Sequence, residues 1–321
     1  MADHHLIGIE IGGTKLQLVR AGASLSIHEE RCMDVQQAAG AAGIRRQIEK
    51  TLRQLTAGQQ ISAVGMGFGG PVNYLNGQVS VSHQIDGWEG FDLRHWLEAL
   101  VQAPAFIDND ANVAALGEAV HGAGQQYDTV FYMTIGSGIG GGVVQQGKIY
   151  HGAIPGEVEI GHVRLNKQGQ TLESLCCGWA VDQRVREEAR LRPGGLLARL
   201  VGSAERRGAQ FLHAALQQND PTARDILLST ADNIAFALSH IVHLFHPEVI
   251  VIGGGLSSLG NYLTSEISAA LPRYLMTSFL PPPPVRMAAL GRHAVPVGAL
   301  ELARTALLTH DPETGKINSS V

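Results

Sequence analysis

Residues 8–15 read GIEIGGTK, and this stretch with its neighbours indicates how the chain begins to fold. The apolar run at 6–11 predicts a buried strand, and strand character resumes at 16–20. The two glycines between these runs permit a tight turn, because glycine adopts positive φ without a steric penalty. The stretch therefore predicts a β-hairpin with a glycine turn.

A second unit of the same kind is predicted later in the chain. A strand at 129–135 leads into a glycine-rich turn at 136–142, and a second strand follows at 143–146. The repetition suggests two structurally related α/β lobes. We expect an N-terminal lobe at 1–122, which a C-terminal helix at about 298–308 joins, and a C-terminal lobe at 123–297.

Helical and strand patterns alternate through the rest of the chain, as expected of α/β lobes. The four prolines at 281–284 predict a rigid loop. The patterns predict helices at 39–55, 91–101, 112–120 and 225–245, and strands at 61–68, 105–107 and 248–252.

Composition limits the classes of function. The chain has 321 residues, a net charge of -5 and scattered basic residues, so it lacks the basic surface typical of nucleic-acid binding. Its longest apolar runs are shorter than a membrane span, and the three cysteines cannot form a disulfide framework. We expect a cytoplasmic protein with small-molecule partners, and neither a nucleic acid nor a membrane among its partners.

Three glycine-rich turns follow predicted strands, at 12–13, 136–142 and 253–255. Backbone amides without obstructing side chains can surround phosphate groups, so these turns are candidates for nucleotide binding. Each turn alone could equally be a tight turn that needs positive φ. Neither the P-loop pattern nor the dinucleotide-binding fingerprint fits, because one turn is too short and another leads into a strand.

Asn109 and Asp110 lie where a predicted strand ends and a helix begins. Polar side chains at the carboxyl ends of strands project toward ligands in α/β folds. The alternative is structural, because Asn and Asp are also the residue types that favour helix N-caps. The position alone leaves both interpretations open.

Four motifs together make the sequence similar to the ROK family of bacterial sugar kinases and related repressors. They are GIEIGGTK at 8–15, NDAN at 109–112, IGSGIGGG at 135–142 and EIGH at 159–162, and VIVIGGG at 249–255 resembles the family's adenosine-side motif. The resemblance covers about residues 6–305. It implies an actin-like, ribonuclease-H-like α/β fold with two related lobes and an interdomain cleft, a homodimer, and ATP-dependent phosphorylation of a sugar hydroxyl.

The resemblance also implies roles for individual residues. Asp110 is the expected general base, and a loose phosphoryl-transfer transition state asks mainly for positioning. The expected sugar-binding residues are Gly70, Asn109, Asp110, Glu159 and His162. The expected ATP-binding residues are Gly12, Gly13, Thr14, Lys15, Gly136, Ser137, Gly138, Gly254 and Gly255.

Two positions depart from the family's pattern. Most relatives have Asp where this chain has Glu10, the residue expected to serve Mg²⁺, and a contact through water would tolerate the longer side chain. Many relatives also bind a structural zinc through a His and three cysteines. Here only Cys177 matches a cysteine position, while Leu175, Asp182 and Arg184 replace two ligands and a sugar-binding Glu. We therefore expect no structural zinc, with Cys176 and Cys177 buried beside Trp179.

Several alternatives remain at this stage. Glucose is the default sugar, while fructose, mannose and N-acetylhexosamines stay open. A sugar-responsive repressor would need a winged helix-turn-helix before the first strand, where about five residues are present. A non-catalytic sugar-binding protein is the second alternative, although binding alone needs no catalytic base.

Overall fold

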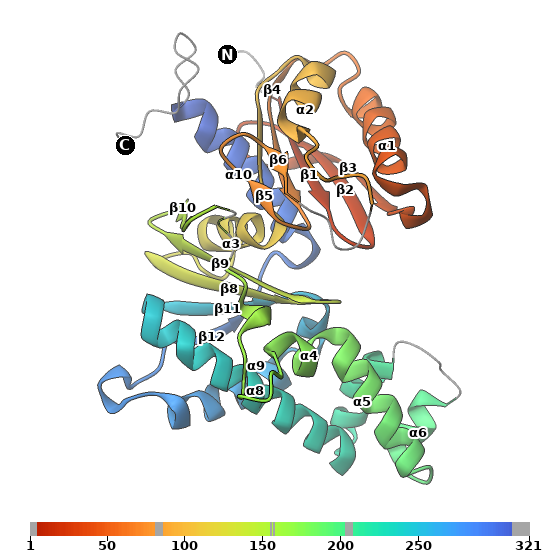
Figure 1. Cartoon of the computed structure of the whole chain (residues 1–321), viewed down its shortest axis with the longest axis vertical. Helices are drawn as coiled ribbons and strands as arrows, with labels where there is room; N and C mark the ends of the chain where they lie inside the picture. Colours follow the sequence, from red (N-terminus) through yellow and green to blue (C-terminus); the bar gives the residue numbers. More distant parts are fainter. Residues whose placement is uncertain (1–4, 81–85, 155, 157, 203–207, 310–321) are drawn as a thin grey trace. The chain divides into compact units, whose positions relative to one another are not determined.

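The computed structural model describes residues 5–80, 86–154, 156, 158–202 and 208–309, and it divides into two compact units (Figure 1). Unit 1 consists of Met1–Gln125, Gly142–Glu157 and Arg292–Val321, and unit 2 of Gln126–Gly141 and Val158–Gly291. The sequence predicted a second lobe at 123–297, which includes residues 142–157. The division instead places them with unit 1.

Unit 1 contains a five-stranded sheet with the order β3-β2-β1-β4-β7. The first three strands are antiparallel neighbours, and β4 and β7 extend the sheet in parallel with β1. A short hairpin, β5–β6, follows β4. The strands are β1 His5–Ile11, β2 Lys15–Ala21, β3 Ile27–Asp34, β4 Ile61–Phe68, β5 Val72–Asn73, β6 Gln78–Val79 and β7 Ala105–Asn109.

Helices cover both faces of this sheet (Figure 1). The apolar side chains of α1 Gly40–Leu55 and α2 Leu93–Val101 pack on one face, against the alternating residues Ile7, Ile9 and Ile11 of β1. The helix α10 Ala294–Thr309 packs on the other face and contacts α3 Asp110–His121. Because β1 is covered on both faces, all seven of its residues are buried.

The second sheet has the order β10-β9-β8-β11-β12, with β11 parallel to β8 and β12. A hairpin strand pair followed by parallel strands repeats the arrangement of the first sheet. Its strands are β8 Thr129–Ile135, β9 Ile139–Gln145, β10 Lys148–Ile149, β11 Val249–Gly253 and β12 Val285–Met287. The helices of unit 2 are α4 Leu172–Cys176, α5 Gly178–Leu191, α6 Leu196–Val201, α7 Leu212–Gln217, α8 Pro221–Phe245 and α9 Asn261–Ala270.

Short 3₁₀ helices connect these elements. They are η1 Gln37–Ala39, η2 Ile160–His162, η3 Gly208–Phe211, η4 Gly255–Leu259, η5 Leu271–Tyr274, η6 Thr277–Phe279 and η7 Gly291–His293. The proline run at 281–284 lies outside regular structure and leads into β12, as its composition predicts.

The long helix α8 is long and apolar enough to be a candidate membrane span, and it is the one such helix among the described residues. Its most apolar window is 61% buried inside the protein. It packs against α4, α5 and α9 within unit 2. Its hydrophobicity is therefore that of a helix in the core of its unit.

Several boundaries differ from the sequence prediction. The strand β9 begins at Ile139 rather than at residue 143, so Gly140, Gly141 and Gly142 lie in a strand and not in the turn. Glycine has low β-propensity, but here it allows close approach: a Cβ at Gly142 would lie 3.0 Å from the carbonyl oxygen of Ala111.

Two helices begin four residues earlier than predicted, while α3 begins only two residues early, at Asp110. The helix α8 starts at Pro221, because Asp220 caps it by accepting a hydrogen bond from the Ala223 amide, and proline is well suited to a first helical turn. The helix α10 starts at Ala294 rather than at 298. In both cases the sequence pattern located the helix but not its first turn.

Candidate active site

The carboxyl ends of three parallel strands form the candidate site of unit 1. The register pairs Ile11 of β1 with Phe68 of β4, and Phe68 with Asn109 of β7, so the three strands end side by side. The residues that follow are the glycines 12–13, the glycines 69–70 and Asp110. Three stretches that are far apart in the sequence therefore meet at one edge of the sheet, where α/β folds bind ligands.

Asn109 both ends β7 and caps α3. Its Oδ1 accepts hydrogen bonds from the amides of Ala111 (2.8 Å) and Asn112 (3.3 Å), so the structural interpretation of this residue is correct. Its Nδ2 also donates to the carbonyl oxygen of Gly70 at 3.3 Å. The cap thus connects two of the expected sugar-binding residues.

Asp110 occupies the first turn of α3, next to the two glycine turns. A Cβ at Gly69 would lie 3.4 Å from Asp110 Oδ2 and 3.3 Å from Gly12 Cα. The Gly69 amide donates to the Ile11 carbonyl oxygen at 2.7 Å. A side chain at Gly69 would therefore press against both the Asp110 carboxylate and the backbone of the Gly12 turn.

The turn after β1 carries a charged pair. The Gly12 amide donates to the Lys15 carbonyl oxygen at 2.8 Å, and Lys15 Nζ lies 2.7 Å from Glu10 Oε2. Burial raises the pKa of the Glu10 carboxyl above its ordinary value, and the Lys15 ammonium group opposes this rise. Thr14 is exposed, whereas Gly12 and Gly13 are partly buried.

In unit 2, a short turn joins β8 to β9. The Gly136 amide donates to the Gly138 carbonyl oxygen at 2.9 Å, and the Gly136 carbonyl oxygen accepts from the Gly178 amide at 2.7 Å. Ser137 is exposed at the tip of this turn. Glu173 Oε2 accepts a hydrogen bond from the Ile139 amide at 2.7 Å, a contact that the sequence pattern did not indicate.

Gly254 follows β11 and lies against Ile135, the last residue of β8. Its φ is +82°, and a Cβ there would lie 2.5 Å from the Ile135 amide nitrogen. Both features exclude other residue types at this position. Gly255 begins η4, and no atom lies within 4 Å of where its Cβ would be. Unit 2 therefore brings the expected residues at 136–138 and 254–255 together at the ends of β8 and β11.

Glu159 precedes the 3₁₀ helix η2, His162 is the last residue of η2, and both side chains project into solvent. The exposed fractions of their side chains are 52% and 71%, and Glu159 Oε2 lies 3.9 Å from His162 Nε2. Between them Ile160 and Gly161 are buried, and a Cβ at Gly161 would lie 2.3 Å from the Ile139 carbonyl oxygen. The buried middle of this motif holds the two polar side chains outward.

The degenerate cysteine segment is packed as small buried residues. Cys176 is fully buried and Cys177 is 7% exposed, as predicted, whereas Trp179 is 55% exposed. Burial, together with the neighbouring Cys177, raises the pKa of the Cys176 thiol to about 12, so it stays protonated at neutral pH. No group of three or more metal-binding His, Cys, Asp or Glu side chains occurs within the described ranges. The expectation that structural zinc is absent stays a prediction.

A model of the ROK family matches residues 6–306 of this chain. The chain belongs to the ROK family. Among curated ROK-like relatives, glucokinase from Thermotoga maritima is 31% identical over 283 residues, which are 86% of this chain and 89% of that protein. Glucokinase from Streptomyces coelicolor is 31% identical over 313 residues, which are 93% of this chain and 97% of that protein.

Solved ROK structures have the same fold. A ROK glucokinase from Streptomyces griseus, solved in complex with glucose and AMPPNP, superposes with a TM-score of 0.82 at 30% identity. The match covers 94% of this chain and 99% of that one. This ROK chain therefore has the actin-like ATPase fold, as the resemblance to the family implied.

Some site residues could not have been found by motif. Asp108, Tyr74 and His151 contact one another or the Asn109 cap in unit 1, and Glu173 contacts the turn after β8 in unit 2. Asp108 contacts its neighbour Asn109. Each of the other contacts joins residues that are at least 34 positions apart in the sequence. The signal in the sequence was at most a polar residue next to a recognised motif.

Proposed function

We propose that this protein transfers the γ-phosphoryl group of ATP to a hexose hydroxyl, with Asp110 as the general base. The protein is a sugar kinase, since glucokinases about 30% identical to it match nearly its whole length. The observation that carries the role of Asp110 is its place at the row of strand ends, 3.4 Å from where a Cβ of Gly69 would be and beside the Gly12 turn.

In the proposed reaction the base must be well oriented, but it need not be strong. The phosphoryl group passes through a loose transition state, and the sugar hydroxyl becomes acidic only as its bond to phosphorus forms. The Asp110 carboxylate then accepts the hydroxyl proton, while Asn109 and Gly70 hold the sugar. Because the Asn109 cap fixes the first turn of α3, the Asp110 carboxylate in that turn is oriented before the sugar binds.

The two glycine turns are the proposed phosphate sites. Gly12, Gly13, Thr14 and Lys15 would contact phosphate groups from unit 1, and Gly136, Ser137 and Gly138 from unit 2, by bare backbone amides and the Lys15 ammonium. Gly254 and Gly255 would contact the adenosine. The glucokinase from Streptomyces griseus binds AMPPNP, an ATP analogue, which supports ATP as the phosphoryl donor here.

Gly254→Ala is expected to raise the KM for ATP roughly tenfold, a loss of about 1.4 kcal/mol of binding. The new Cβ would overlap the Ile135 backbone, and the φ of +82° would be strained. Steady-state kinetics with ATP varied at saturating sugar measure this change, with the thermal midpoint as a check on folding. An unchanged KM for ATP in a folded variant would remove Gly254 from the nucleotide site.

Glu10 fits a magnesium ion held through water. It is a buried hard oxygen donor at the end of β1, and a Cβ at Gly12 would lie 4.0 Å from its Oε1, which places the carboxylate beside the proposed phosphate turn. Burial raises the pKa of Glu10, and the Lys15 ammonium opposes this rise and so favours the ionised form that such a role needs. When bound there, Mg²⁺ would neutralise charge on the phosphate oxygens.

The sugar contacts are proposed on both units. Gly70, Asn109 and Asp110 are the contacts of unit 1, and the exposed Glu159 and His162 are those of unit 2. Glucose is the first candidate, because the glucokinase from Streptomyces griseus binds it.

We further propose that the protein is a cytoplasmic homodimer without nucleic-acid or membrane partners. We also propose that its two lobes divide near residue 122.

The test is ADP release with Mg²⁺ and ATP across a panel of hexoses and amino-hexoses, with Asp110→Asn as the blank. Release above the blank with at least one sugar is expected, and the best sugar names the substrate class. If no sugar supports release while calorimetry shows that sugar binds, the protein is a non-catalytic sugar-binding member of the family instead.

A further inference from the structure

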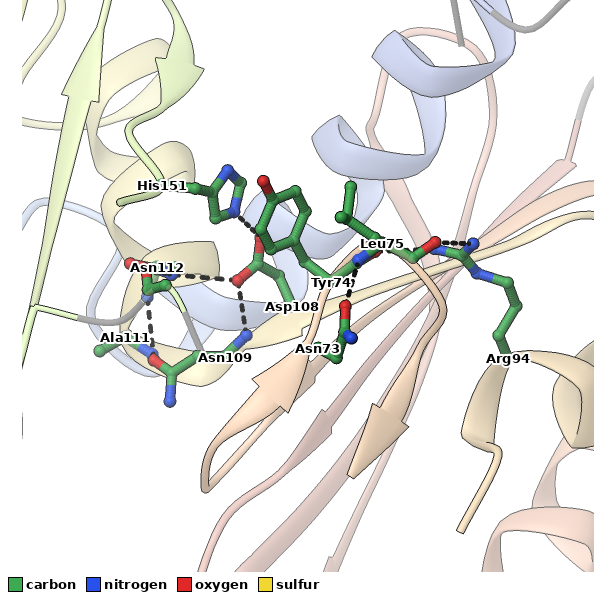
Figure 2. Close-up of polar contacts among 10 residues, drawn as sticks. Asn73, Tyr74, Leu75, Arg94, Asp108, Asn109, Ala111, Asn112 and His151 are labelled. Carbon is green, nitrogen blue, oxygen red and sulfur yellow. Dashed lines mark hydrogen bonds and ion pairs between the residues drawn. The ribbon is translucent and has the colours of Figure 1, made fainter. Parts of the chain in front are cut away.

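Asp108 is a buried carboxylate directly before the proposed Asn109–Asp110 pair, and three donors surround it (Figure 2). Its Oδ1 accepts from the Asn109 amide at 2.7 Å and from Asn112 Nδ2 at 3.0 Å. Its Oδ2 accepts from His151 Nε2 at 2.6 Å. A carboxylate with 3% exposure is stable only when such donors are present, so its contacts determine where this strand end lies.

His151 also stacks on an aromatic ring. Figure 2 shows its imidazole beside the Tyr74 ring, and the ring centroids are 3.7 Å apart with an interplanar angle of 10°. Gly156 lies next to this stack with a φ of +89°, and a Cβ there would lie 3.4 Å from His151 Cδ2. The stack and the hydrogen bond together determine the orientation of the His151 ring.

Tyr74 belongs to the turn of the β5–β6 hairpin, which follows Gly70 in the chain. Arg94 holds this turn, because its guanidinium donates to the carbonyl oxygens of Leu75 (2.7 Å) and Tyr74 (2.9 Å). Gly70 in turn accepts a hydrogen bond from Asn109 Nδ2. The hairpin is therefore connected to the Asn109 cap at two places, through Gly70 and through the Tyr74–His151–Asp108 series of contacts.

We propose that His151 is a positioning residue for the reaction, which holds the Asn109–Asp110 turn and the β5–β6 hairpin in one fixed geometry around the sugar. The inference rests on the proposed function, because Asn109 and Asp110 are the sugar-binding and base residues there. His151 takes no part in the proton transfer or the phosphoryl transfer. Its effect is mechanical: a misplacement of about 1 Å of a reacting group can lower a rate roughly 10²-fold.

The experiment compares His151→Leu, His151→Gln and Tyr74→Leu with the control His121→Leu. His121 Nε2 lies 2.8 Å from Glu301 Oε2, a matched histidine–carboxylate contact in the same unit but at the C-terminal end of α3. Each variant is measured for kcat, for the KM of sugar and of ATP, for glucose affinity by calorimetry, and for its thermal midpoint.

For His151→Leu we expect kcat to fall 10- to 100-fold, the sugar KM and the glucose dissociation constant to rise severalfold, and the KM for ATP to stay within twofold. His151→Gln should recover most of kcat, because its Nε2 can still donate to Asp108. Tyr74→Leu should show a smaller loss of the same kind. His121→Leu should lower the thermal midpoint by about as much as His151→Leu does, but it should leave kcat unchanged.

Equal kinetics in His151→Leu and wild type, or an equal kcat loss in His121→Leu, would overturn the inference while leaving the proposed function intact. If the wild type binds glucose but transfers no phosphoryl group, the proposed function fails and the calorimetric comparison still decides the inference. If the wild type binds no sugar, both are wrong.

Discussion

Asp110→Asn is expected to lower kcat for sugar phosphorylation by about 10³-fold, within the range that removal of a general base produces, and to leave the sugar dissociation constant within a few-fold. Asparagine keeps the shape of the side chain and a hydrogen bond to the sugar hydroxyl, but it cannot accept the proton. Single-turnover phosphorylation of the best sugar of the panel measures the loss, and calorimetry measures sugar binding.

The stability of this variant should be nearly unchanged. Asp110 lies in the first turn of α3, where a negative charge interacts favourably with the helix dipole by roughly 0.3–1 kcal/mol. The matched control is Asp92→Asn, because Asp92 caps α2 in the same unit, by accepting a hydrogen bond from the His95 amide at 2.9 Å. Its turnover should equal that of wild type. Turnover by Asp110→Asn above one tenth of wild type would contradict the role of base.

Gly298→Ala is expected to destabilise the protein by about 2–3 kcal/mol, although alanine favours a helix interior by about 1 kcal/mol over glycine. The new Cβ would lie 1.8 Å from the Val113 carbonyl oxygen and 3.0 Å from the Gly117 amide nitrogen. Both neighbours are backbone atoms of α3, so no rotamer change can relieve the overlap. The helices α3 and α10 must move apart instead.

For Gly298→Ala we expect the thermal midpoint to fall by about 5–10 °C, which is the shift that this loss of unfolding free energy produces in a domain of this size. The control is Gly194→Ala in unit 2, where no atom lies within 4 Å of the new Cβ and the effect should stay within about 0.5 kcal/mol. A midpoint within 2 °C of wild type for Gly298→Ala would show that α10 does not pack on α3 through this glycine.

Most strands could be predicted from the sequence because their burial is simple. Strands β4 and β8 have the predicted bounds, at 61–68 and 129–135, since continuous apolar runs between glycines and polar residues mark strands buried on both faces. Strand β9 was predicted too short. Its glycines at 140–142 carry no side-chain signal, and η2 and α3, which closely approach Gly141 and Gly142 respectively, belong to other parts of the chain.

The candidate site was predictable where residues that are adjacent in the sequence form it. Asn109 and Asp110 could be placed at a strand–helix junction from local pattern, and the junction is present. The contact of His151 with Asp108 was not predictable, because the two residues are 43 positions apart and neither belongs to a motif. The same is true of Glu173, which lies 34 positions after Ile139.

The sequence by itself determined the ROK family, the two glycine-hairpin sheets and the residue types of the site, because local apolar periodicity and short glycine motifs carry that information. Only the tertiary structure decided that Ile11, Phe68 and Asn109 end in one row, that Gly298 meets Val113 and that His151 meets Asp108. The physical reason is that strand register, helix packing and the pairing of a buried charge depend on residues brought together by the fold, whose separation in the chain leaves no local pattern.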